Sequence, residues 1–370
     1  MSLKDIYCQD KAVDFLQRSF AAGKSTHAYI FAGDEGIGKF MTAKQWAKML
    51  LCKNPVTENN FADSCGSCQS CRLLEADSHP DFSHIYKELL EFTKEGKGKT
   101  TPVDLAVDVI REFLIDKVSV KPTLSERKVF VISEAERLNA SSQNAMLKVL
   151  EEPPEYCTII LICTRTEKLL PTIKSRAQAL RFDPIDPKII VQKLEELGLS
   201  KKPAQYFARL AQGSLGRAAR WAQLELDGAE LYETKKQLLS YLANLQYPDT
   251  LETAQWLLEQ SKSIAANWAE LEKNTSKTDI NRRAQKILIR MTISALYDAM
   301  RLNLTQPEKI INLDQNPQIK ALAKRFDPPL AAQKISDCYQ TIRWIESSVN
   351  EKLVFDQLLL NLAVSDTMKV

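Results

Sequence analysis

Two short apolar runs, with a helical segment between them, constrain the fold of this chain more than any other feature. The runs are Val129–Ile132 and Thr158–Cys163, and each has the length and β-branched content of a buried strand. Ala140–Glu151 lies between them with apolar residues at helical spacing, and Ser141 or Ser142 is the expected N-cap. A strand, a helix and a second strand in this order predict a parallel βαβ unit within an α/β domain.

A glycine-containing turn near the amino end of the chain predicts a phosphate loop. An expected strand, Ala28–Ala32, precedes the turn, and an expected helix, Phe40–Leu51, follows it. The turn has the pattern of glycine, four residues, then glycine and lysine, in which backbone amides surround phosphates and the lysine neutralises charge. The pattern residues, which would bind ATP or ADP, are Gly33, Gly36, Gly38 and Lys39.

The positions that would hold magnesium in such a site carry unsuitable side chains. A working loop has serine or threonine after its lysine, and Phe40 stands there instead. The second strand of the nucleotide site would end in two acidic residues, but the chain reads Ile132–Ser133–Glu134. We therefore expect no ATP hydrolysis by this chain, whereas the sequence leaves open whether it still binds nucleotide.

Four cysteines follow the phosphate-loop helix at a spacing typical of a metal site. Thiolates separated by two residues turn inward around one ion, and four sulfur ligands favour tetrahedral zinc. The alternatives are unligated cysteines or an iron–sulfur site, which would require a further cysteine where Glu75 stands. We expect His79 and His84 to make local hydrogen bonds instead of binding the metal. The expected ligands of a structural zinc ion are Cys52, Cys65, Cys68 and Cys71.

Length and composition define the class of protein. The chain has 370 residues, of which 44% are hydrophobic, so it is long enough for two or three domains with separate cores. Its formal net charge is only +3, which does not favour a dedicated nucleic-acid binder. Because it lacks a long apolar run and a secretory signal, and its cysteines are unevenly spaced, we expect a cytoplasmic protein.

The chain becomes helical after the βαβ unit. Pro184 and Pro187 indicate a linker, and helical spacing then continues toward the end of the chain. We divide the chain into an α/β domain over residues 1–182, a small helical domain over 183–225 and an all-α domain over 226–370. The first domain contains the cysteine module, over about residues 52–71. Glu88–Thr101 is rich in charge and glycine, which predicts an exposed loop or, alternatively, a basic contact surface.

Several motifs together resemble one protein family. They are HAYIFAGDEGIGK, the cysteine segment SCGSCQSCR, DSHPDF, NAMLKVLEEPPEYCTIILIC, LLPTIKSRA and VNEKLVFDQLLLNLA. In order and spacing they resemble the delta-prime subunits of the bacterial DNA polymerase III clamp loader, over almost the whole chain. The resemblance implies a RecA-like AAA-plus domain with a parallel sheet, a small helical lid and an all-α collar for oligomerisation.

The resemblance also implies partners and a function. Members of this family join a five-subunit ring with a delta subunit and with gamma or tau motor subunits. The ring places the sliding clamp on primed DNA. The family's delta-prime subunits are usually poor or inactive ATPases that serve a neighbouring motor, and Phe40 and Ser133 agree with that role.

Individual site residues follow from the resemblance. Ser175–Arg176–Ala177 matches the family's SRC motif, with alanine for cysteine, and the arginine of that motif reaches the ATP site of the next subunit. Because Arg176 comes after the short segment Pro171–Lys174, we expect it at a helix start on the domain surface. An intrachain ion pair or a contact with DNA phosphate is the alternative.

Two further residues match nucleotide sensors of the family. Thr164 lies where the sensor after the second strand would be, and Gly213–Arg217 resembles the sensor motif of the lid. Arg217 would therefore face a nucleotide in this subunit, and a solvated helix charge is its alternative.

Two competing functions remain open at this point. One is an active ATP-hydrolysing motor subunit of the gamma or tau kind, which Phe40 and Ser133 oppose. The other is a zinc-dependent nucleic-acid adaptor, which the near-neutral charge and the closed set of four cysteines disfavour.

Overall fold

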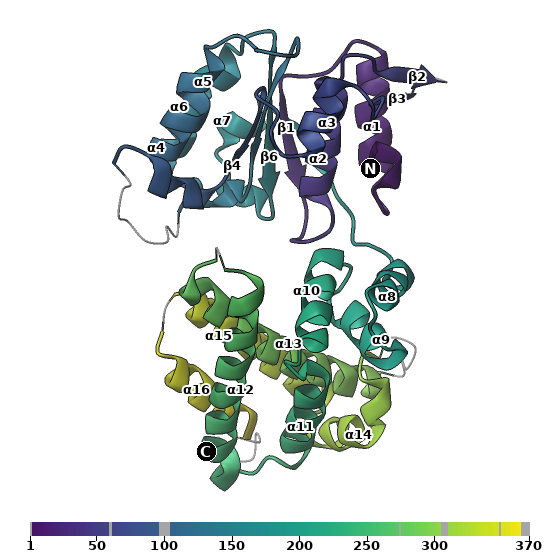
Figure 1. Cartoon of the computed structure of the whole chain (residues 1–370). Coiled ribbons are helices and arrows are strands. Elements are labelled where there is room, and N and C mark those ends of the chain that lie inside the picture. The colour runs from purple at the N-terminus through teal and green to yellow at the C-terminus, as the bar shows by residue number, and fades with distance from the viewer. Residues whose placement is uncertain are drawn as a thin grey trace. The chain divides into compact units, whose positions relative to one another are not determined.

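The predicted strand–helix–strand segment forms part of a five-stranded parallel sheet in the computed structural model (Figure 1). The two apolar runs form β5, Lys128–Ile132, and β6, Cys157–Cys163, and α6, Ala140–Glu151, connects them. The strand before the phosphate loop, β1, Ala28–Ala32, pairs with β6 on one side and with β7, Gln178–Arg181, on the other. The fifth strand, β4, Phe82–Ile85, pairs with β5, so the strand order is β4-β5-β6-β1-β7.

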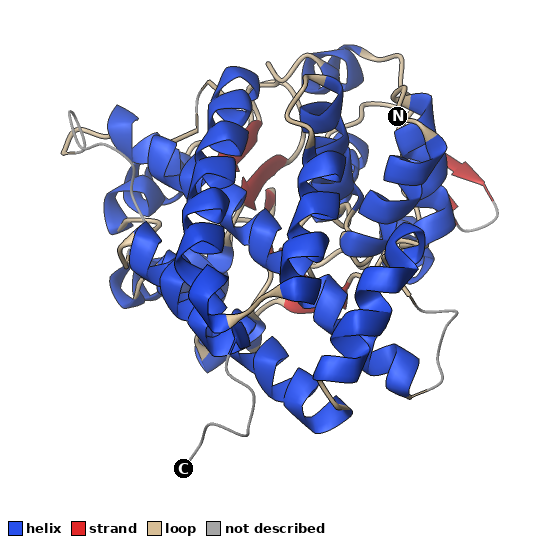
Figure 2. Cartoon of the chain, turned by 90° about the horizontal axis from the view of Figure 1, so that it is seen from below, coloured by secondary structure: helices blue, strands red, loops and turns tan. Residues whose placement is uncertain are grey.

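The structure describes residues 2–58, 61–95, 104–273, 275–304, 310–347 and 349–363. The chain divides into two compact units, the first comprising Met1–Asp186 with Ser214–Gly216 and the second comprising Pro187–Gly213 with Arg217–Val370. Helices predominate over strands among the described residues (Figure 2). Among the described residues, no helix combines the length and the apolar character needed to cross a membrane.

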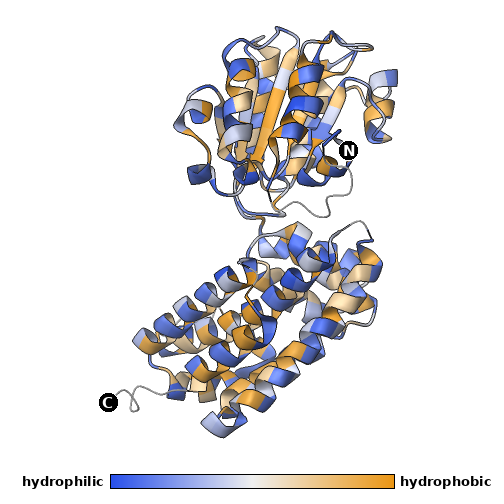
Figure 3. Cartoon of the chain, turned by 90° about the vertical axis from the view of Figure 1, so that its left-hand side faces the viewer, coloured by the Kyte–Doolittle hydropathy of each residue, from blue (hydrophilic) through white to orange (hydrophobic). Residues whose placement is uncertain are grey.

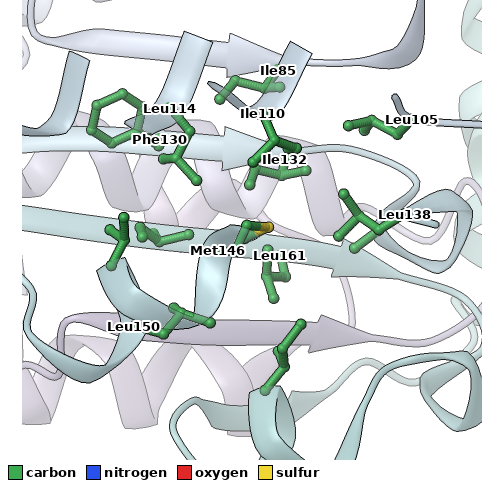
Figure 4. Close-up of a cluster of buried hydrophobic side chains, with 14 of the residues drawn as sticks. Ile85, Leu105, Ile110, Leu114, Phe130, Ile132, Leu138, Met146, Leu150 and Leu161 are labelled. Atoms are coloured by element: carbon green, nitrogen blue, oxygen red, sulfur yellow. The ribbon is translucent and has the colours of Figure 1, made fainter. Parts of the chain in front are cut away.

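One face of the sheet packs against α6. Successive residues of a strand point to opposite faces, so Phe130 and Ile132 of β5 share a face with Leu161 of β6. Met146 and Leu150 of α6 cover these side chains (Figure 4). All five residues are buried, so this face forms a core of the first unit.

The opposite face packs against two helices from the amino-terminal part of the chain. These helices are α1, Asp10–Ala21, and α2, Lys39–Leu50. Trp46 of α2 contacts Tyr29 of β1 edge to face, with ring centroids 5.8 Å apart. Val131 of β5 lies in the same core. Central strands of a sheet covered on both faces are almost continuously apolar, and Figure 3 shows orange arrows within the sheet.

The remaining elements of the first unit are short. Antiparallel strands β2, Val56–Glu58, and β3, Phe61–Asp63, form a separate two-stranded sheet. The other helical elements of this unit are η1 (Leu3–Asp5), α3 (Gln69–Glu75), η2 (Lys87–Phe92), α4 (Val107–Ile110), the π-helical η3 (Arg111–Ile115), α5 (Asp116–Val118), η4 (Ala135–Arg137), η5 (Thr166–Lys168) and α7 (Pro171–Lys174).

The described residues of the second unit form helices and loops without strands, as expected for the carboxy-terminal part. Its helical elements are α8 (Pro187–Glu196), α9 (Lys201–Leu210), α10 (Leu215–Leu226), α11 (Leu231–Asn244), η6 (Tyr247–Asp249), α12 (Thr250–Leu271), α13 (Lys277–Asn303), η8 (Leu313–Gln315), α14 (Asn316–Arg325), α15 (Pro328–Glu346) and α16 (Glu351–Ala363). The fold class, a parallel α/β domain followed by helices, is confirmed. The division between a lid and a collar near residue 225 stays a prediction.

Three details differ from the sequence-based expectations. The sequence pattern does not predict strands β4 and β7. Both are edge strands, and exposed or polar residues stand among their apolar ones. The N-cap of α6 is Asn139, whose side chain accepts a 2.8 Å hydrogen bond from the Ser142 amide. The segment expected as an exposed loop begins with η2, in which Leu90 is buried. Residues 96–103 lie outside the described residues.

Candidate functional site

The phosphate loop has the backbone geometry that its glycines predict. Gly33 has φ of +149°, and a Cβ atom there would lie 2.7 Å from both the Phe182 carbonyl oxygen and the Ile37 side chain. Gly38, the N-cap of α2, has φ of +100°, a region that side chains rarely adopt. Gly36 also has positive φ, at 77°. The loop between β1 and α2 therefore requires glycine both for conformation and for space.

The lysine of the loop is directed back toward the loop itself. Lys39 Nζ donates a 2.6 Å hydrogen bond to the Gly33 carbonyl oxygen and a second bond to the Asp34 carbonyl oxygen. The residue is 4% exposed, and burial lowers the pKa of its ammonium group. In this conformation the ammonium group offsets the partial charges of the loop carbonyls.

An aromatic and hydroxyl cluster occupies the positions expected to anchor magnesium. The ring centroids of Phe40 and His84 lie 4.5 Å apart, and those of His84 and Tyr86 lie 4.9 Å apart. His84 Nε2 is 2.8 Å from Ser133 Oγ, so the ring is hydrogen-bonded, but its partner lies 49 residues away and is not local as expected. Burial lowers the pKa of His84 to about 4, so the ring is neutral near pH 7. We call Phe40, His84, Tyr86 and Ser133 the His84 cluster.

The acidic residue after Ser133 is engaged with cations of its own domain. Glu134 has φ of +51°, and its Oε2 atom lies 3.2 Å from Arg137 Nε and 3.8 Å from Lys87 Nζ. A carboxylate in two ion pairs is less available to polarise a water molecule than one that faces an open site. The end of β5 thus offers neither an aspartate for a metal nor a free carboxylate at the next position.

The sensor candidate Thr164 pairs with a carboxylate that the sequence did not point to. Its Oγ1 donates a 2.5 Å hydrogen bond to Glu136 Oε1, and its amide donates to Glu136 Oε2 at 3.2 Å. Arg217, the other sensor candidate, lies in the first turn of α10, where its Nη1 donates to the Ala211 carbonyl oxygen at 3.3 Å. The sensor roles of both residues stay predictions.

The four cysteines converge on one point. Cys52 follows α2, Cys65 and Cys68 lie in the loop after β3, and Cys71 lies in α3. All four sulfur atoms lie within 4.8 Å of one another. The Sγ atom of Cys52 is 3.5 Å from that of Cys65 and 3.9 Å from that of Cys68. Zinc bound tetrahedrally at about 2.3 Å from each sulfur would separate the sulfurs by about 3.8 Å, so the geometry fits this ion.

Backbone amides favour the thiolate form in part of this cluster. The amides of Ser67 and Cys68 lower the pKa of the Cys65 thiol to about 6. Burial raises the pKa of Cys71. His79 takes no part in the cluster, because its Nε2 lies 2.6 Å from Ser70 Oγ, in agreement with the expected local hydrogen bond.

Arg176 lies beyond the end of α7, and the expectation that it starts a helix is wrong. β7 begins at Gln178, which leaves no room for a helix after Arg176. Arg176 Nη2 lies 2.8 Å from Glu151 Oε1, and Nη1 donates to the Thr172 carbonyl oxygen at 2.9 Å. The side chain is still 33% exposed. The neighbouring Ser175 Oγ donates to the same carbonyl oxygen at 3.1 Å.

Comparison with known proteins assigns the family. Residues 8–186 match the family described as DNA polymerase III, delta subunit, and residues 280–363 match its C-terminal family, described as DNA polymerase III, delta subunit, C terminal. This chain belongs to the DNA polymerase III delta-subunit family. The two matches together include the phosphate loop, the cysteine cluster and Arg176 as well as most of α13 to α16.

Individual relatives of this delta-family chain carry two kinds of name. The delta' subunit of DNA polymerase III from Bacillus subtilis is 29% identical over 234 residues, which are 62% of this chain and 65% of the relative. The tau subunit from Escherichia coli is 33% identical over 217 residues, which are 57% of this chain and 31% of the relative. Each match thus spans less than two thirds of the relative's own length. Sequence similarity alone does not separate a delta'-type from a tau-type subunit.

A solved structure covers nearly the whole chain at low similarity. The DNA polymerase III gamma subunit-related protein from Thermotoga maritima covers 96% of this chain and 98% of its own, at 18% identity and a TM-score of 0.45. The fold class of this delta-family chain rests on its own strand order.

The structure adds three residues that sequence reasoning did not assign to these sites. His84 links Phe40 to Ser133, Glu136 holds Thr164, and Glu151 pairs with Arg176. The sequence signal for His84 is its place near the cysteines. The one signal in the sequence for Glu151 is its place at the carboxy end of α6, where a negative charge is unfavourable to the helix.

Proposed function

We propose that this chain is a clamp-loader subunit of DNA polymerase III that does not hydrolyse ATP and supplies Arg176 to the ATP site of a neighbouring motor subunit. Its partners would be gamma or tau motor subunits and a delta subunit in a five-subunit ring. This ring would load the sliding clamp onto primed DNA. Membership of the delta-subunit family and the named relatives support the assignment.

The observation that carries the proposal is the His84 cluster. Phosphoryl transfer depends on a magnesium ion held by a hydroxyl group after the loop lysine and by a carboxylate at the end of the second strand. This chain places a phenyl ring and an imidazole–hydroxyl pair at those positions. A phosphate loop without metal anchors has lost the means of hydrolysis, so its domain serves a partner's site.

Arg176 is the group through which the domain would act on that partner. A guanidinium group stays charged and presents a planar fork of donors, which matches the oxygens of a phosphoryl group in transfer. The exposed third of the Arg176 side chain leaves the group accessible to another subunit. Arginine fingers accelerate phosphoryl transfer by about 10³- to 10⁵-fold in other systems.

The test uses the assembled complex with Arg176→Ala. We expect normal assembly, with the clamp- and DNA-stimulated ATPase rate reduced at least about tenfold, since other arginines in the ring would retain part of the activity. Arg181→Ala is the matched control, because Arg181 is an exposed arginine on the adjacent strand. Clamp loading at the wild-type rate by the Arg176→Ala complex would contradict the proposal.

The alternative function is an ATP-hydrolysing motor subunit, which the match to the tau subunit favours. Phosphate release from ATP by the isolated chain separates the two functions. We expect no magnesium-dependent turnover above background. Turnover that disappears in Lys39→Ala would establish the motor function, because that lysine belongs to the phosphate loop of this chain.

We further propose that the four cysteines bind one structural zinc ion. Their sulfur separations and the lowered pKa of Cys65 support this ligand set. Four protein ligands complete the tetrahedral shell, which leaves no position for a substrate. The ion would therefore join the end of α2 to α3 without taking part in catalysis.

A further inference from the structure

Arg176 is held by a carboxylate that no part of the nucleotide site requires. Glu151 is the last residue of α6, and its Oε1 atom lies 2.8 Å from Arg176 Nη2. Arg176 Nη1 meanwhile donates to the backbone at Thr172. Two nitrogens of the guanidinium fork are thus engaged within the chain, on the edge of the group that a phosphate would use.

The position of Glu151 is unfavourable for the helix that carries it. The carboxy end of a helix bears partial negative charge, so a carboxylate in its last turn is repelled unless a cation lies nearby. Arg176 supplies that cation. Helix stability alone would favour a neutral or basic residue at position 151, so the pair with Arg176 gives this carboxylate its role.

A buried glutamine fixes the distance between the two partners. Gln143 of α6 is 4% exposed. Its Nε2 donates to the Lys168 carbonyl oxygen at 3.1 Å, and its Oε1 accepts from the Leu170 amide at 2.8 Å. These bonds attach the segment that enters α7 to α6, so Glu151 and Arg176 lie on one rigid support.

The Glu151–Arg176 ion pair is strong enough to orient the Arg176 side chain and weak enough for another anion to take the place of Glu151. The side chains of Arg176 and Glu151 are 33% and 48% exposed, and ion pairs at such exposure contribute little because water and salt screen them. A phosphate carries more charge than a carboxylate and also presents two oxygens that can accept both hydrogen bonds of the guanidinium fork. A nucleotide presented by a neighbouring subunit would therefore displace Glu151.

We propose that Glu151 is a positioning residue that retains Arg176 within its own chain until a neighbour's nucleotide replaces the carboxylate. This inference rests on the proposed action of Arg176 in a neighbouring site. It assigns the Glu151–Arg176 pair the function of limiting ATP hydrolysis in the complex before clamp and DNA bind. Loss of the carboxylate raises basal turnover and leaves stimulated turnover unchanged.

The first measurement concerns the pair itself in the full-length chain. Phenylglyoxal modifies accessible guanidinium groups, and mass spectrometry of the Arg176 peptide gives the rate at that residue. We expect Glu151→Gln to raise this rate about two- to fivefold, the factor that corresponds to a partly exposed ion pair. Glu152→Gln, which removes the same charge from the next residue, leaves the rate unchanged. An unchanged rate in Glu151→Gln would overturn the proposal.

The second measurement concerns turnover in the assembled complex. We expect Glu151→Gln to raise the ATPase rate without clamp and DNA about two- to fivefold and to leave the stimulated rate within error. Glu151→Asp, which keeps the charge on a shorter side chain, gives an intermediate basal rate. A basal rate equal to that of wild type, or an equal fall in both rates, contradicts the role of Glu151.

The Arg176→Ala complex separates this inference from the proposed function. When Arg176→Ala lowers stimulated turnover but Glu151→Gln changes nothing, only the role of Glu151 fails. When Arg176→Ala leaves turnover unchanged, the action of Arg176 in the neighbouring site fails, and the role of Glu151 fails with it. In the Arg176→Ala background, Glu151→Gln should have no further effect on basal turnover, because its partner is gone.

Discussion

Gly33 is the residue at which the phosphate loop tolerates least change. Its φ of +149° is rarely adopted by residues with a side chain, and the Phe182 carbonyl oxygen lies only 2.7 Å from the position that a Cβ atom would take. Its amide also donates to the Cys163 carbonyl oxygen at 3.1 Å, which ties the loop to the end of β6. The geometry of the loop therefore depends on this position.

Gly33→Ala should lower the free energy of unfolding by about 2–4 kcal/mol, because strain at positive φ adds to a steric overlap with backbone. Gly23→Ala is the matched control, since Gly23 has φ of +66° but no atom lies within 4 Å of the place that an added Cβ atom would take. The control substitution should lower the free energy of unfolding by about 1 kcal/mol, because only backbone strain opposes it. Urea denaturation of both variants measures the difference, and equal losses would show that crowding at residue 33 is unimportant.

Stability should fall as the pH drops below about 6.5, partly because of His84. The folded chain holds this ring neutral, with a pKa of about 4, whereas an unfolded histidine has a pKa of about 6.5. The unfolded state therefore binds the proton first, and the contribution of His84 is complete above pH 6.5 and lost as the pH approaches 4. The size of this effect is at most about 3 kcal/mol.

His84→Phe isolates this contribution, because phenylalanine retains the contacts with Phe40 and Tyr86 but does not titrate. We expect the unfolding free energies of the two proteins to converge, or to reverse order, between about pH 7 and about pH 4.5. Denaturant titrations at several pH values provide the measurement. Parallel pH profiles for the two proteins would mean that His84 titrates normally in the folded chain.

At the scale of secondary-structure elements, we expect the small β2–β3 sheet and α3 to depend on the proposed zinc site. Each of these strands has three residues, which is too few for an antiparallel pair to be stable alone. Thiolate-bound zinc in small modules contributes about 10 kcal/mol or more to local folding. The metal would thus supply the order that so short a segment cannot obtain from its own core.

Cys68→Ser should reduce zinc from about one ion per chain to well below that value and lower solubility, while the parallel sheet remains folded. Cys8→Ser is the control, because Cys8 lies outside the cluster, with its sulfur near the Asp186 amide. Elemental analysis and circular dichroism provide the readouts. Purified wild-type protein that is stable without metal would contradict the structural role of zinc.

The elements that the sequence predicted best are those with the strongest local patterns. β1 and α6 have the predicted bounds, because apolar runs and helical spacing are properties of the segment alone. β4 and β7 escaped prediction because a strand at a sheet edge is defined by its neighbour's hydrogen bonds and not by its own composition. The N-cap was misplaced by two residues or more because several capping residues follow one another there.

The candidate site was predictable in its residues but not in its contacts. The glycine pattern, the cysteine spacing and the SRC-like motif are visible along the chain, so Gly33, Cys68 and Arg176 could be identified. The partners of these groups come from distant segments, and sequence spacing carries no information about them. Glu151 and His84 are residues of this kind, since each meets its partner only through the packing of the sheet and its helices.

At the scale of the whole molecule, a positive charge alone at position 176 should not restore the proposed effect of Arg176 on ATP hydrolysis. Arg176→Lys retains a cation but presents a single ammonium group in place of a planar fork. We expect the assembled complex with lysine to recover less than about one tenth of the ATPase rate lost in Arg176→Ala. Steady-state turnover with clamp and primed DNA is the measurement, and wild-type turnover with lysine would mean that Arg176 supplies only charge.

Helix α2 joins the two chemically specialised parts of the first unit. It begins at the loop lysine and ends at Leu50, two residues before the first cysteine of the cluster. Its twelve residues form a helix about 18 Å long, with the glycine-containing loop at one end and the cysteine cluster at the other. Under the proposed zinc site, loss of the metal would loosen the carboxy-terminal end of α2, and amide exchange along the helix would show how far that loosening extends toward the phosphate loop.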